Sequence, residues 1–85
     1  MPKSVFSKRY KLLRNLLVVE RKSAGLTQQQ LAARLGKPQS FVSKFELGER
    51  RLDAIEFLAV ARALGADPYA ILRKVERAPR GGTAR

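Results

Sequence analysis

Residues 26–50 read LTQQQLAARLGKPQSFVSKFELGER, and they predict two short helices joined by a tight turn. The hydroxyl of Thr27 can cap the first helix, and Gln30, three residues later, can complete a capping box. Gly36 ends this helix because glycine adopts the left-handed conformation easily, and a Lys-Pro turn follows. A second glycine, Gly48, ends the second helix. Two helices joined in this way form a helix-turn-helix, a motif that places its second helix in the DNA major groove.

The second predicted helix has an inward face and an outward face. Val42 and Phe45 are expected to point inward together with Glu46. The outward side chains are polar and suit hydrogen bonds to base edges. Phe41 projects beside them, where it either touches a thymine methyl group or packs as a partly shielded aromatic. The outward residues are Gln39, Ser40, Ser43 and Lys44.

An ordered series of positions in and around this stretch is far more specific than any single dipeptide. The series is Gly25-Leu26-Thr27-Gln28, Leu31-Ala32, Leu35-Gly36, Val42-Ser43, Glu46, Gly48, Arg50, Phe57, Val60-Ala61, Leu64-Gly65 and Asp67-Pro68. With it the chain resembles the lambda-repressor-like (Cro/CI-type, or XRE) helix-turn-helix regulators over about residues 9–76. The resemblance implies an all-α, compact five-helix domain with a long first helix. The alternative is a small helical bundle that happens to contain a helix-turn-helix.

The resemblance also implies which side chains read bases. The base-reading positions of the family fall on Gln39, Ser40 and Lys44, with Ser43 nearby. The chemistry agrees, because the Gln39 amide can bind adenine bidentately and Lys44 can donate to guanine. Gln28 falls on a position that grips a phosphate and buttresses the first recognition residue.

One further contact is implied by the resemblance, an ion pair between Arg21 and Glu46. In the family this pair ties the first helix to the end of the recognition helix. A buried pair contributes little net stability, but loss of one partner leaves the other charge unpaired and costs about 3–5 kcal/mol.

The chain is strongly basic, with 18 Lys and Arg against 7 Asp and Glu, a formal net charge of +11 and a pI near 11.2. This balance indicates a polyanionic partner, which we take to be double-stranded DNA. Lys37, Arg50 and Arg51 flank the recognition surface and are expected to bind phosphates, which position a protein without specifying sequence. The chain has no Cys and no His, so we expect no catalytic residue, no enzyme activity, no metal and no cofactor.

A chain of 85 residues is expected to form one domain. We assign residues 1–6 to a flexible basic arm, residues 7–76 to the DNA-binding domain, and residues 77–85 to a flexible basic tail. The first helix is expected to be capped by Ser4 or Ser7.

The first helix is apolar over about half of its circumference, which is wider than the roughly 100° that faces one core. Leu12, Leu16 and Val19 lie together in this arc. The surplus surface needs another partner, either the C-terminal helix or a second subunit. A basic amphipathic helix can also lie on a membrane, although lipid would then compete with the helix-turn-helix for the same side chains. We recognise no signal peptide or membrane span and expect a cytoplasmic protein.

Two more helices are predicted after the recognition helix. Asp53 and Glu56 form a second capping box, and Asp67 caps a last helix that has Pro68 at its first position. Residues 53–76 carry three bases and four acids, a net charge of −1. This end can therefore face another subunit while the basic end faces DNA.

One module of this size reads too few base pairs for useful specificity among genomic competitors. Family members mostly bind as two-fold dimers to inverted repeats whose half-sites lie about 10–10.5 bp apart. We therefore expect a homodimer on an inverted-repeat operator. The candidate dimer contacts, each of which can instead belong to the intramolecular core, are Ile55, Leu58, Tyr69 and Leu72.

The expected function is sequence-specific DNA binding by a small transcriptional regulator, most often a repressor that occludes a promoter. A second class competes with it, an antitoxin-like DNA-binding protein whose main task is to capture a toxin partner. The basic tail is short for that role, but folding on binding could make it adequate.

Overall fold

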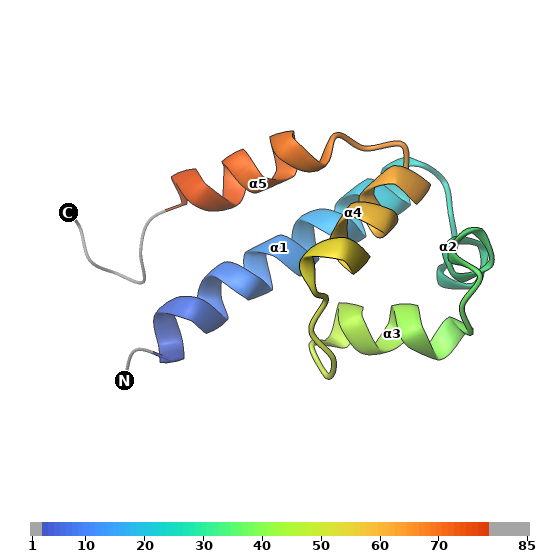
Figure 1. Ribbon diagram of the computed structural model, residues 1–85, viewed down its shortest axis with the longest axis horizontal. Coiled ribbons are helices and arrows are strands. Elements are labelled where there is room, and N and C mark those ends of the chain that lie inside the picture. Colours follow the sequence, from blue (N-terminus) through green and yellow to red (C-terminus); the bar gives the residue numbers. More distant parts are fainter. Residues whose placement is uncertain (1–2, 79–85) are drawn as a thin grey trace.

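The computed structural model describes residues 3–78, and in that range it contains five α-helices and no strand. This confirms the predicted all-α class, and the second and third helices form the helix-turn-helix (Figure 1). The helices are α1 (Lys3–Ser23), α2 (Gln28–Leu35), α3 (Gln39–Leu47), α4 (Ala54–Ala63) and α5 (Pro68–Arg77).

The long first helix is the spine of the molecule. It contacts α5 along one side and α3 along the other, while α4 contacts both α2 and α5 (Figure 1). The recognition helix α3 packs on α2 and on α1. The position of α3 is therefore set by two other helices. None of the helices in residues 3–78 combines the length and the apolar character needed to cross a bilayer.

The helical boundaries differ slightly from the predicted domain limits. Helix α1 begins at Lys3, so part of the predicted arm and both candidate serine caps lie within the helix. No glycine or proline occurs between the two ends of α1, so nothing in this sequence stops the helix from starting early. Helix α5 ends at Arg77. The other residues of the predicted arm and tail, 1–2 and 79–85, lie outside the described range.

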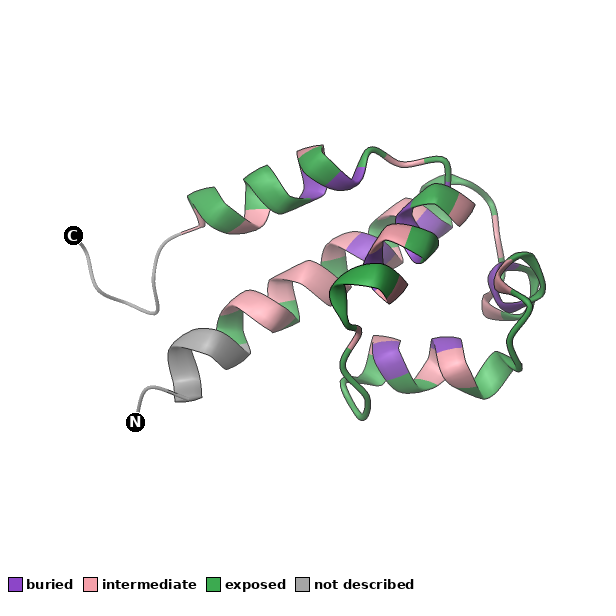
Figure 2. Ribbon diagram, in the orientation of Figure 1, coloured by how far each residue is buried: buried purple, intermediate pink, exposed green. Residues whose placement is uncertain are grey.

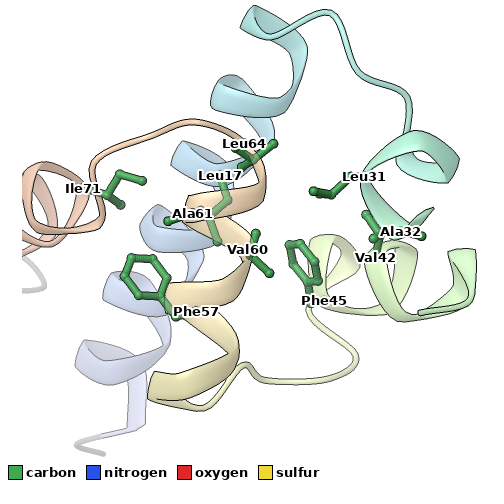
Figure 3. Close-up of a cluster of buried hydrophobic side chains, with 10 residues drawn as sticks. All are labelled: Leu17, Leu31, Ala32, Val42, Phe45, Phe57, Val60, Ala61, Leu64 and Ile71. Carbon is green, nitrogen blue, oxygen red and sulfur yellow. The ribbon is translucent and has the colours of Figure 1, made fainter. Parts of the chain in front are cut away.

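The hydrophobic core lies where α1, α4 and the helix-turn-helix meet (Figure 2). Phe45 of α3 is fully buried and lies beside Val60 of α4 (Figure 3). The buried face of α4 is formed by Phe57, Val60 and Ala61. From the wide arc of α1, Leu17 enters the core, whereas Val19 remains exposed. The buried apolar residues are Leu17, Leu31, Ala32, Val42, Phe45, Phe57, Val60, Ala61, Leu64 and Ile71.

The predicted N-terminal caps of α2, α4 and α5 are present. The Thr27 hydroxyl oxygen accepts a hydrogen bond from the Gln30 backbone N–H, and the Thr27 backbone N–H donates to Gln30 Oε1. Asp53 and Glu56 form the second capping box. Asp67 accepts from the backbone N–H of Tyr69 at the start of α5. These local signals depend only on near neighbours in the sequence, which explains why they can be predicted without a structure.

The C-terminal end of α3 is closed by a contact from α1. The Nη1 of Arg14 donates to the carbonyl oxygen of Glu46 at 2.8 Å. Gly48 follows with φ of 84°, and a Cβ built there would lie 2.9 Å from the Arg14 Cζ. Glycine is therefore required at position 48 for two reasons: its backbone has a positive φ, and the Arg14 guanidinium occupies the space that a side chain would need.

We predict that Gly48→Ala destabilises the domain more than Gly36→Ala does. Both glycines have positive φ, so each change costs about 1–2 kcal/mol in left-handed strain. Nothing lies within 4 Å of a Cβ at Gly36, whereas at Gly48 the Arg14 guanidinium must move and lose its hydrogen bond, a further ~1 kcal/mol. Urea unfolding measures both losses.

Equal losses for the two variants would contradict this account. In an Arg14→Ala background the contact no longer exists, so Gly48→Ala should then cost no more than Gly36→Ala.

Candidate nucleic-acid interface

The outward face of α3 presents the polar side chains that the sequence assigned to base reading. Gln39, Ser40 and Lys44 are exposed, and Ser43 is half-buried, with its hydroxyl 3.3 Å from the Ser40 carbonyl oxygen to which it donates. The opposite face anchors the helix in the core through Val42 and Phe45. The helical period thus brings four polar side chains to one surface.

Beneath this surface lies the ion pair that the resemblance implied. The Nε of Arg21 donates to Glu46 Oε2 at 2.8 Å, and its Nη2 donates to Oε1 at 3.1 Å. The Nη1 of the same guanidinium donates to the Leu26 carbonyl oxygen at 2.8 Å. The two side chains are only 11% and 6% exposed, so the pair is almost fully removed from solvent. It links α1, the segment before α2, and α3.

A hydrogen-bond chain runs from this ion pair to the surface. Gln28 Nε2 donates to Glu46 Oε1 at 2.8 Å, and Gln39 Nε2 donates to Gln28 Oε1 at 3.4 Å. A carboxylate only accepts, so Gln28 must turn its NH₂ group toward Glu46 and its oxygen toward Gln39. Gln39 then turns its own NH₂ group inward and keeps its oxygen and one N–H available. Gln28 is thus placed to buttress Gln39, and phosphate binding by Gln28 stays a prediction.

Phe41 is half-buried on the flank of α3. Its ring packs edge-on against Phe45, with the centroids 5.8 Å apart. The Lys37 Nζ lies 5.6 Å from the Phe41 centroid and the Arg50 Cζ lies 4.8 Å from it. The structure therefore shows Phe41 as a packed, partly shielded aromatic, and its contact with a thymine methyl group stays a prediction. The ring also holds two cations beside the recognition helix.

Sequence reasoning missed the ion pair between Arg50 and Glu56. The Arg50 Nη1 lies 2.9 Å from Glu56 Oε1 and the Nη2 lies 2.6 Å from Oε2, a bidentate arrangement. The hydrogen bonds from Arg50 are the largest cause of a Glu56 pKa lowered to about 2. Glu56 also accepts from the Asp53 backbone N–H at 2.9 Å. Its role as a capping residue was readable from sequence, but its second partner was not.

The loop after α3 is anchored to α1 through Tyr10, a second contact that sequence reasoning missed. The Arg51 guanidinium lies 4.4 Å from the centroid of the Tyr10 ring. The Tyr10 hydroxyl accepts from the Leu52 backbone N–H at 3.0 Å and donates to the Arg50 carbonyl oxygen at 3.4 Å. The loop that carries two predicted phosphate-binding residues is therefore held in place by the first helix.

Three arginines bind backbone carbonyls at helix C-termini. Arg14 closes α3 as described above. Arg34 donates to the Ala63 carbonyl oxygen at 2.9 Å, and Arg9 donates to that of Ala78 at 3.0 Å. Cations suit these positions because the helix dipole is negative there. Part of the large positive charge therefore stabilises the fold, which composition alone does not reveal.

The four candidate dimer residues divide into two groups. Ile55, Tyr69 and Leu72 have exposed side chains, with Ile55 the most exposed at 74%. Leu58 is partly buried and packs against the core. Leu58 therefore contributes to the core of one chain, the other three lie on the surface, and the dimer contacts stay a prediction.

Comparisons with known proteins agree with this geometry. Residues 20–71, more than half of the chain, match the family described as "Helix-turn-helix". The protein y4dJ of Sinorhizobium fredii, described as an uncharacterized HTH-type transcriptional regulator, is 33% identical over 61 residues, or 72% of this chain and 79% of y4dJ.

Two solved structures are similar in fold. An XRE-family like protein from Pseudomonas syringae pv. tomato is 57% identical, with a TM-score of 0.85 over 87% of this chain and 90% of its own. The clp gene regulator ClgR from C. glutamicum is 24% identical, with a TM-score of 0.72 over 80% of this chain and 88% of its own. At that identity, the second likeness shows the fold alone.

We predict that Arg21→Ala lowers the free energy of unfolding by about 3–5 kcal/mol, because it leaves the Glu46 carboxylate buried without its cation. The matched control is Lys22→Ala, an exposed neighbour in the same helix turn, which should change stability by less than ~0.5 kcal/mol. Thermal unfolding followed by circular dichroism measures both. An Arg21→Ala variant with an unchanged melting temperature would refute the structural role of the pair.

Proposed function

We propose a function on the premise that this chain belongs to the XRE-type helix-turn-helix family of DNA-binding transcriptional regulators. In this proposal the protein is a sequence-specific regulator that reads the major groove of double-stranded DNA with α3. The observation that supports this best is the hydrogen-bond chain from the Arg21–Glu46 pair through Gln28 to Gln39. That chain orients an exposed amide before any DNA arrives, and such preorganisation reduces the entropy lost on binding.

The base contacts come from the N-terminal half and the middle of α3. The free oxygen of Gln39 can accept from adenine N6, and its remaining N–H can donate to adenine N7. Lys44 can donate to guanine O6 or N7, and Ser40 and Ser43 adapt to either donors or acceptors. Phe41 lies beside these residues and can contribute a contact to a thymine methyl group.

The phosphate contacts lie around this helix. Lys37 and Arg51 are exposed cations on either side of α3 in the sequence, and Gln28 stands at the first position of α2. Backbone N–H groups at that helix end also suit an anionic oxygen. These contacts fix the register of the protein on the duplex, and α3 then reads the sequence.

The protein acts as a homodimer on an inverted repeat. Its dimer contacts come from the exposed apolar residues of α4 and α5, namely Ile55, Tyr69 and Leu72. Residues 53–76 carry a net charge of −1, so this region approaches a second copy without the repulsion that the basic remainder of the chain would cause. Two copies double the number of base pairs that are read.

Its biological role is repression, in which the bound dimer occludes a promoter. The role places the protein where DNA is found in a bacterial cell, in the cytoplasm. Occupancy of the operator then depends on the concentration of the protein or on a partner.

The experiment that tests this function is selection from random duplex DNA at near-physiological salt, followed by sequencing of the bound pool. We expect an enriched inverted repeat whose half-sites lie about 10–10.5 bp apart. Bound DNA without any enriched sequence would contradict sequence-specific reading. An enriched single half-site, together with a monomer in analytical sedimentation, would contradict only the proposed dimer and would leave sequence-specific reading in place.

Two variants in the same selection distinguish a residue that reads a base from one that binds a phosphate. Gln39→Ala should lose the preference at one base pair of each half-site, at a cost of about 1–3 kcal/mol. Lys37→Ala should recover the same sequence but bind every duplex more weakly, with a log–log salt slope flatter by about 0.9. A changed base preference in Lys37→Ala, or a uniform loss in Gln39→Ala, would reverse these assignments.

A further inference from the structure

A carboxylate lies among the cations on the flank of the recognition helix. Glu56, the third residue of α4, contacts Arg50, and Arg50 in turn lies over the ring of Phe41 in α3. Lys37 lies over the same ring and adds to the positive field at the carboxylate. Of the residues expected to bind DNA phosphates, Arg50 thus contacts a negative charge of the protein itself, and Lys37 acts on that charge without a direct contact.

The contact between Arg50 and Glu56 has the geometry by which arginine binds a phosphate. Two parallel N–H···O bonds, at 2.9 and 2.6 Å, join both terminal nitrogens of Arg50 to both oxygens of Glu56. The Nη1 also donates to the Arg51 carbonyl oxygen at 3.1 Å. The fork of donors that would clasp a phosphate is already occupied.

Both partners remain accessible to solvent, with side-chain exposures of 41% for Arg50 and 23% for Glu56. The pKa of Glu56 is lowered to about 2, mainly by the hydrogen bonds from Arg50, so the carboxylate is ionised at any physiological pH. The pair is thus a surface ion pair that an incoming anion can reach. Such pairs contribute little to stability.

We propose that Glu56 is an internal competitor of DNA phosphates for Arg50, and that it limits how strongly this protein binds DNA of any sequence. The inference rests on the proposed function and deepens it by assigning to Glu56, which is not a base-reading residue, a role in limiting the strength of phosphate binding. A phosphate that approaches Arg50 meets the Glu56 charge beside it, so the attraction of the guanidinium is largely cancelled. Removal of that charge frees one cation for the DNA backbone.

The test variant is Glu56→Gln, because glutamine keeps the helix cap. Gln and Glu are both accepted at the third position of a capping box, so the bond from the Asp53 N–H to the side-chain oxygen is retained. The variant loses only the negative charge and the bidentate grip on Arg50. Circular dichroism and the melting temperature should therefore be close to those of the wild type.

The measurement is binding of a labelled duplex of arbitrary sequence, and of the selected site, between 50 and 200 mM salt. Glu56→Gln should bind both duplexes more tightly, with a log–log salt slope steeper by about 0.9. Between 200 and 50 mM salt, its advantage over the wild type should therefore grow about threefold. The selected sequence should not change, since no base-reading residue is touched.

Two controls separate competition from a general change in charge. Glu49→Gln makes the same change in net charge at an exposed position next to Arg50 in the loop after α3, and it should give a smaller gain. In an Arg50→Gln background, Glu56→Gln should lose most of its effect, because no guanidinium is left to release.

Weaker binding by Glu56→Gln would overturn the proposal, since it would mean that the carboxylate holds Arg50 in its DNA-binding position. Equal gains in Glu49→Gln and Glu56→Gln, or an undiminished gain in the Arg50→Gln background, would overturn it as well. A wild-type protein that binds no duplex at all would refute the proposed function and this inference together. Wild-type binding without the Glu56→Gln gain would refute only the inference.

Discussion

The ion pair between Arg21 and Glu46 is the contact on which the placement of the recognition helix depends. It joins the first helix to the third across 25 residues of sequence, and its two side chains are almost fully buried. A buried carboxylate needs its partners, because an unpaired charge in the interior is strongly unfavourable. Glu46 obtains them from Arg21 and Gln28, and among residues 8–78 no buried side-chain nitrogen or oxygen lacks a hydrogen-bond partner. The pair thereby selects one arrangement of α1 and α3, whatever its net contribution to stability.

The ion pair also determines how a side chain on the outer surface is oriented, because each hydrogen bond between them needs one donor and one acceptor. Because Glu46 can only accept, the orientation of the Gln28 amide follows, and that of Gln39 follows from it. A side chain at the proposed DNA surface is thus oriented from the core of the domain.

Part of the positive charge of the chain is used within the fold, since some arginines close helix ends and others stack on aromatic rings. A net charge of +11 therefore overstates the number of cations free to bind phosphates.

The features that could be predicted from sequence are local. Both capping boxes and the glycine at the end of α2 depend on residues within four positions, and the period of α3 separates its inward and outward faces. Contacts between distant residues could not be derived in this way. The Arg21–Glu46 pair came only from a family resemblance, whereas the contacts Arg14–Glu46, Tyr10–Leu52 and Arg50–Glu56 were missed. Periodicity tells which face of a helix is buried, but it does not tell which long side chain reaches across from another helix.

The start of α1 was predicted too late in the sequence for a different reason, since serine is a permitted cap but not an obligatory one.

The most direct test of this account is a double-mutant cycle between Gln28 and Gln39 on the selected duplex. If the core orients the reading amide through Gln28, then Gln28→Ala should already disorder Gln39, and Gln39→Ala should cost less in that background. The coupling should fall within about 0.5–3 kcal/mol, while the pair Gln28→Ala and Lys44→Ala should be additive. Additive losses for Gln28 and Gln39 would mean that the amide at the surface is oriented by the DNA alone, and the link from the buried ion pair to sequence reading would be wrong.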